Sequence, residues 1–288
     1  TNCMSPIEKG DHPEMDTSDL LDPEQTKLCQ SLIGALQWVV TIGRFDVMTA
    51  ITSLSSFRAA PRKGHLDRVK RIYRCLLKMK HAWIRVRTEE PDHSGIPHME
   101  IDWSRSVCGA ITELIPDDAP EPLGHCVTLS HFVDANLMHD LATGRSLTGI
   151  LHLLNKTPVD WFSKKQATVE VATYSSKMVA MRTCVEQIVD LRNTLMYLGV
   201  PIRDKSCVFG DNESVVKSAA QLHAKLHKCH NMLSFHFVRE AIAAGYVFFT
   251  HIPGSTNPAD ILSKHWGYSD VWPILKALLF WEGDTMEC

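Results

Sequence analysis

Three aspartates in the second half of the chain stand where predicted elements begin or end. Asp134 ends a predicted strand, Asp211 follows another, and Asp260 opens the last predicted helix of that half. Acids at strand ends and at a helix start can converge in one crevice of an α/β sheet. Converging carboxylates repel unless a cation lies among them, and hard oxygen ligands select Mg²⁺ or Mn²⁺. The alternative is three unrelated surface aspartates, because Asp commonly caps helices.

Hydrophobic spacing predicts the elements that carry these acids. From residue 24 to residue 80, apolar residues recur three and four positions apart, which indicates helices. Short strands are then predicted at 126–133, 146–154 and 158–162, followed by a long helix at about 174–197. The remaining elements are a strand at 207–209, a helix after Asp211, a helix at 233–244, a strand at 246–252 and a short helix from Pro258. This succession predicts an α/β domain with a mixed five-stranded sheet flanked by helices.

Composition divides the 288 residues into five expected regions. These are an extended lead-in at 1–24, a helical region at 25–95, a linker at 96–125 rich in Pro, Gly and acids, the α/β domain at 126–266, and a C-terminal helix or tail at 267–288. The chain begins without Met, so we expect it to be a piece of something longer.

One segment is strongly basic although the whole chain has a net charge of −3. Residues 58–87 contain eleven Lys and Arg against Asp67 alone, a net charge of +10. A concentrated basic segment in an acidic chain predicts a phosphate-binding surface, with Arg68, Arg71 and Lys78 as candidate nucleic-acid contacts. The alternative is a solvated helix face.

Cysteine usage and hydropathy bear on the compartment. The nine cysteines are widely spaced with no C-x-x-C pair, which indicates reduced intracellular thiols. No apolar stretch approaches the roughly 20 residues that a bilayer requires, so we expect no membrane partner.

Several short motifs together carry a family resemblance. Their order and spacing are specific, although each motif alone is weak. The motifs are VDAN at 133–136, GRSLTG at 144–149, WFSKKQ at 161–166, GDNES at 210–214, HFVRE at 236–240 and NPADILSK at 257–264. The sequence resembles the ribonuclease H region of copia-type retrotransposon polyproteins, over about residues 25–266. Upstream, SLIGAL at 31–36, GRFDV at 43–47 and LSSF at 54–57 look like the thumb- or connection-like helical end of the reverse transcriptase.

The resemblance implies a ribonuclease H-like fold that hydrolyses the RNA strand of RNA–DNA hybrids with four carboxylates and two Mg²⁺ ions. It implies that Asp134 bridges both metals, that Asp260 helps hold the ion that activates water, and that Asp211 shares the other ion with a glutamate. Paired ions clamp the entering and departing oxygens of an in-line displacement. The implied partners are the hybrid and the rest of the polyprotein, in a cytoplasmic particle or the nucleus. The polymerase fingers and palm are missing, so we expect no DNA synthesis from this chain.

The sequence departs from the family at the glutamate. Counting back from Leu198-Gly199 without a gap places Lys177 at that position, and its neighbours supply no carboxylate. An ammonium about 4 Å from a divalent ion is repelled by several kcal/mol even at an effective dielectric of about 20. We therefore expect the second metal to bind poorly, unless the ammonium of Lys177 itself occupies the vacated cation position.

Other polar residues have less specific interpretations. Lys164, Lys165 and Asn212 are candidate nucleic-acid contacts, or exposed turn polarity. His236 and Arg239 match a family motif and either support hybrid binding or pack a helix. A further set has partial zinc-ligand spacing but lacks a completing cluster: His223, His227, Cys229 and His230.

Three functional hypotheses follow. The first is a ribonuclease H-like domain whose two-metal activity is impaired by Lys177. The second is a non-catalytic nucleic-acid-binding module, in which residues 58–87 supply affinity. The third is a decayed transposon fragment.

Overall fold

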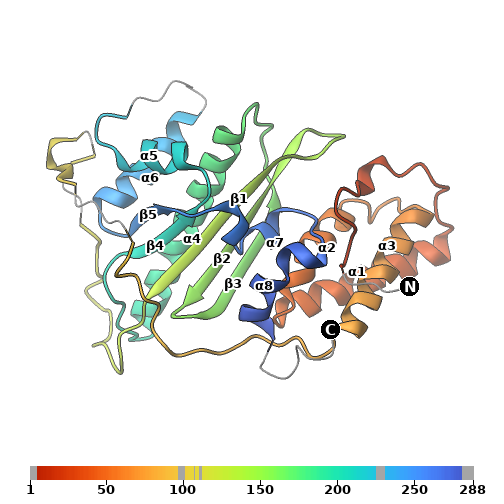
Figure 1. The fold of residues 1–288 in the computed structure, drawn as a ribbon, viewed down its shortest axis with the longest axis horizontal. Coiled ribbons are helices and arrows are strands. Elements are labelled where there is room, and N and C mark those ends of the chain that lie inside the picture. Colours follow the sequence, from red (N-terminus) through yellow and green to blue (C-terminus); the bar gives the residue numbers. More distant parts are fainter. Residues whose placement is uncertain (1–4, 97–100, 107, 110–111, 225–230, 281–288) are drawn as a thin grey trace.

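A mixed five-stranded sheet forms the centre of the protein in a computed structural model that describes residues 5–96, 101–106, 108–109, 112–224 and 231–280 (Figure 1). Its strands are β1 (Leu129–Asp140), β2 (Arg145–Leu154), β3 (Thr157–Lys165), β4 (Ser206–Gly210) and β5 (Val247–His251), in the order β3-β2-β1-β4-β5. Strands β1 to β3 run antiparallel, whereas β4 and β5 run parallel to β1 and to each other. This order confirms the predicted fold class.

Both faces of the central strands carry buried apolar residues, because helices cover both sides of the sheet. Val133 and Ile150 belong to the core beneath α4 (Thr173–Tyr197), α5 (Glu213–Ala220) and α6 (Met232–Ala243). Their neighbours Phe132 and Leu151 point to the opposite face, as the two-residue period of a strand requires. There they meet α7 (Asp260–Ser263) and α8 (Tyr268–Leu279).

The N-terminal helices form a separate layer at the β3 side of the sheet (Figure 1). They are α1 (Pro23–Thr41), α2 (Met48–Ser55) and α3 (Lys63–Lys78), and they share their own apolar core. Helix α1 begins where Asp22 caps the backbone N–H of Gln25, directly before Pro23. Helix α2 attaches this layer to the sheet domain, since Thr49 Oγ1 donates to the carbonyl of Ile261 at 2.7 Å.

The segment before α1 packs along the basic helix α3. Arg68 forms ion pairs with Asp11 and Asp16, and Arg71 pairs with Glu8. Gly64 makes room for the Asp16 carboxylate, because a Cβ on Gly64 would lie 1.9 Å from Asp16 Oδ2. The acidic lead-in therefore neutralises one side of α3.

The first strand is longer than the sequence suggested. We expected it at 126–133 with Asp134 at its end, but β1 runs from Leu129 to Asp140 and places Asp134 within the strand. The reason is continued antiparallel pairing with β2, which extends through Asn136 and resumes at Asp140 after an irregularity in register. The parallel pairing with β4, by contrast, stops at Val133.

Candidate active site

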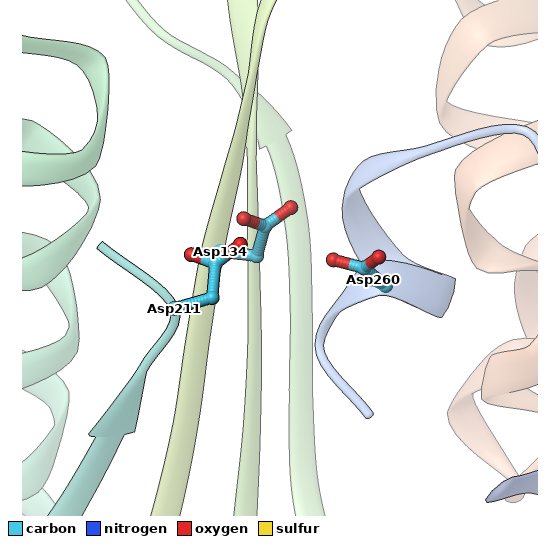
Figure 2. Close-up of side chains that lie close together, drawn as sticks. All are labelled: Asp134, Asp211 and Asp260. Atoms are coloured by element: carbon cyan, nitrogen blue, oxygen red, sulfur yellow. The ribbon is translucent and has the colours of Figure 1, made fainter. Parts of the chain in front are cut away.

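Asp134, Asp211 and Asp260 gather in one place, from the middle of β1, the end of β4 and the start of α7 (Figure 2). One carboxylate oxygen from each lies within 4.8 Å of the others. The predicted convergence is therefore confirmed. Three carboxylates at this separation could hold a metal ion.

The register of the sheet explains why two of these acids meet. Val133 pairs with Gly210 at the last position of the β1–β4 ladder, so Asp134 is the next residue of β1 and Asp211 is the first residue after β4. They follow the last paired position side by side. On its other side Asp134 pairs with Gly149 of β2.

Gly149 allows the third acid to approach. A Cβ at this position would lie 2.7 Å from the carbonyl oxygen of Ala259 and 2.8 Å from the backbone nitrogen of Ser263. Only a glycine lets the backbone of α7 lie this close to the sheet. The preceding Asn257 fixes the same turn, because its buried amide donates to the carbonyl of Val133 at 3.1 Å.

Lys177 lies among the acids. Its Nζ donates to Asp134 Oδ1 at 2.7 Å and also to Asp211 Oδ1. Its side chain is 12% exposed, and that of Asp134 is fully buried. The ammonium therefore stands between two of the three carboxylates.

A second lysine completes the cluster. Lys264 Nζ lies 2.7 Å from Asp260 Oδ1 and 3.2 Å from Asp134 Oδ2. The hydroxyl of Ser263 also donates to Asp134 Oδ2. Sequence reasoning missed both residues, although the i, i+4 spacing of Asp260 and Lys264 is a signal for an ion pair on a helical turn.

The charges shift the pKa values of the acids in opposite directions. Burial opposes ionisation of Asp134, but the ammonium groups of Lys264 and Lys177 outweigh it and lower the pKa of Asp134. Burial and the negative charge of Asp134 raise the pKa of Asp260 to about 6, despite Lys264. Burial lowers the pKa of Lys264, but Asp134 and Asp260 outweigh it, so that pKa is raised. With all five groups ionised the cluster carries a net charge of −1.

These residues do not fit the two-ion site that the resemblance implies. An ion shared by Asp134 and Asp211 would need the space where the Lys177 ammonium lies. The net charge of −1 on the cluster is also too small to balance the four positive charges of two divalent ions. In addition, the ammonium groups of Lys177 and Lys264 would repel each ion.

The other predicted contact residues lie in different environments. Lys164 is exposed, whereas Lys165 pairs with Asp140 at 2.6 Å. The Asn212 side chain caps α5 by accepting from the N–H of Val215. Arg239 is buried and donates to three backbone carbonyls, so it packs α6. His236 is half-buried on the same helix.

The basic segment divides into paired and exposed parts. Arg68 and Arg71 pair with the acidic lead-in, whereas Lys78 is exposed on α3.

The partial zinc motif falls mostly outside the described residues, which do not include His227, Cys229 and His230. Within the described ranges the only group of three or more potential metal ligands is the aspartate cluster. No helix in those ranges has the length and apolarity to cross a membrane.

Sequence comparison gives relatives over most of the chain. It is 22% identical over 247 residues, 85% of its length, to the Retrovirus-related Pol polyprotein from transposon RE1 of Arabidopsis thaliana. It is 22% identical over 234 residues, 81% of its length, to that from transposon TNT 1-94 of Nicotiana tabacum. The chain spans 14% and 15% of the length of these two polyproteins. No protein-family model matches it.

Solved structures match about half of the chain, at low TM-scores. LC11-RNase H1, crystallised with an RNA/DNA hybrid, covers 47% of this chain with 94% of its own, at a TM-score of 0.38 and 15% identity. RNase H1 from Halobacterium salinarum covers 48% with 95% of its own, at a TM-score of 0.35 and 15% identity. Prototype Foamy Virus protease-reverse transcriptase covers 47% with 19% of its own, at a TM-score of 0.33 and 12% identity.

Proposed function

We propose that this chain, a distant homologue of copia-type Pol polyproteins over most of its length, is a ribonuclease H-like domain with impaired hydrolysis of RNA in RNA–DNA hybrids. The helical residues before the sheet are the end of the reverse transcriptase in this proposal. The compartment implied by this descent is a cytoplasmic particle or the nucleus.

One observation carries the proposal: the Lys177 ammonium bridges Asp134 and Asp211. The homologous activity needs a glutamate there and two Mg²⁺ ions. At an effective dielectric of about 20, a divalent ion 4 Å from an ammonium is repelled by about 8 kcal/mol. The long side chain cannot easily leave, because it is 12% exposed and held by two carboxylates. Occupation of the second metal position is therefore strongly disfavoured.

Non-catalytic nucleic-acid binding is the second candidate. Two exposed basic residues favour it, Lys78 on α3 and Lys164 on β3. Within the described part of the chain, neither forms an ion pair with an acid. Such residues supply affinity for phosphates without cleavage. A decayed transposon fragment would retain neither cleavage nor salt-dependent binding.

The test compares three proteins on a labelled RNA–DNA hybrid in Mg²⁺: the natural chain, Lys177→Glu and Lys177→Met. The first substitution restores a carboxylate, and the second removes the charge without adding a ligand. We expect Lys177→Glu to cleave at least about 100-fold faster than both others, since one catalytic group commonly contributes that much. Equal rates in the natural chain and Lys177→Glu would overturn the proposal. Hybrid binding, measured in parallel at several salt concentrations, separates a binding module from a decayed fragment.

A further inference from the structure

We propose that Lys177 and Lys264 are built-in counter-cations of the three acids that differ in permanence: Lys177 stays between Asp134 and Asp211, whereas Lys264 can be exchanged for one divalent ion. The cluster would then keep its shape without metal and still admit one divalent ion. This inference rests on the proposed function in one respect, the descent of the cluster from a metal site.

Each ammonium bridges a different pair of acids. Lys177 joins Asp134 to Asp211, and Lys264 joins Asp134 to Asp260. Asp134 is shared, with one oxygen facing each lysine. This is the arrangement expected when one shared carboxylate bridges two cations.

Lys177 is fixed by its surroundings. It lies on the 25-residue helix α4, and the side chains of Met178 and Met181 beside it are buried in the core. Burial limits its escape to solvent, and departure would leave the Asp134 carboxylate buried without that partner. Removing one partner of a buried ion pair is strongly unfavourable.

Lys264 is free to leave by comparison. Its side chain is 38% exposed, and the residue follows the last position of the four-residue helix α7. A long side chain at such a position can turn its ammonium into water. Asp260, its main partner, is itself 26% exposed. A divalent ion can therefore compete with Lys264 for Asp134 and Asp260.

Manganese titration of the full chain, followed by the electron paramagnetic resonance signal of free Mn²⁺, tests this asymmetry without hybrid or cleavage. The set comprises the natural chain, Lys264→Met, Lys177→Met and the control Lys165→Met. Lys165 is a suitable control because it pairs with Asp140, outside the cluster, and is 17% exposed. We expect the natural chain and the control to bind at most one ion weakly. Lys264→Met should bind one ion at least about tenfold more tightly, because the competing positive charge is gone.

Lys177→Met supplies the second readout. Its Tm should lie below that of the natural chain and rise by about 5 °C in saturating Mn²⁺, as the ion takes the place of the ammonium. The Tm of the control should rise less, because its site is still occupied by the Lys177 ammonium. Tight binding of two ions by the natural chain would overturn the proposal, as would equal Mn²⁺ affinity in Lys264→Met and Lys165→Met. If Lys177→Glu fails to cleave hybrid while this binding pattern holds, the proposed function fails and this inference stands.

Discussion

Gly149→Ala perturbs the contact that seats α7, and with it Asp260, against the sheet. The backbone φ of Gly149 is not in the left-handed region, so alanine meets no conformational barrier there. The cost is steric. The new Cβ would lie 2.7 Å from the carbonyl oxygen of Ala259, whereas ordinary contacts begin at 3.4 Å.

The magnitude follows from which atoms must move. The three nearest atoms all belong to the backbone of residues 259–263, so no flexible side chain can turn aside. The helix must withdraw by about 0.7 Å or β2 must bend. Overpacking of this kind costs about 1–3 kcal/mol, and we expect the upper half of that range because the helix is clamped by Asn257. The Tm should fall by about 3–5 °C.

Urea unfolding followed by circular dichroism measures this change. Gly34→Ala is the matched control, because Gly34 lies within α1 and a Cβ there would meet no atom within 4 Å. That substitution should stabilise the protein by about 0.5–1 kcal/mol through higher helix propensity. The reasoning would be refuted if Gly149→Ala were as stable as the natural chain.

Three other substitutions or conditions test the remaining contacts. Lys177→Met should lower the free energy of unfolding by about 3–5 kcal/mol without divalent ions, since it leaves a buried carboxylate without that partner; unchanged urea stability would contradict the bridging geometry. Arg68→Ala should lower the free energy of unfolding by about 2 kcal/mol and expose the lead-in to limited proteolysis, because Arg68 pairs with two carboxylates of the lead-in. An unchanged rate of proteolysis would count against that packing. Burial lowers the pKa of His139 to about 4 and that of His265 to about 3. Because the unfolded chain then binds protons first, the contribution of these two histidines is present above pH 6.5 and is lost as the pH falls toward 4, by about 6 kcal/mol in total; a flat urea profile between pH 7 and 4.5 would disprove it.

The convergence of the three aspartates was predictable because it depends on local pattern. Asp211 follows a short apolar strand and Asp260 opens a helix, and such positions share one edge of an α/β sheet. The place of Lys177 was also predictable, because a continuous helix keeps its residue count from Leu198 back to its first turn.

The surroundings of the cluster were not predictable to the same extent. The end of β1 was misplaced because the pairing that extends it lies on β2, not in its own residues. Lys264 was missed because its role depends on contact with Asp134, which lies 130 positions away on β1 and which the short helix predicted from Pro258 does not specify. The pairing of the lead-in with α3 joins residues more than fifty positions apart, and charge alone does not specify which acids meet which bases.

The most direct test of the central claim is anomalous diffraction at the manganese edge from crystals of the natural chain soaked in Mn²⁺. The account predicts no manganese between Asp134 and Asp211, with the Lys177 ammonium in contact with both carboxylates. A manganese ion between those two acids, with the Lys177 side chain turned away, would contradict it.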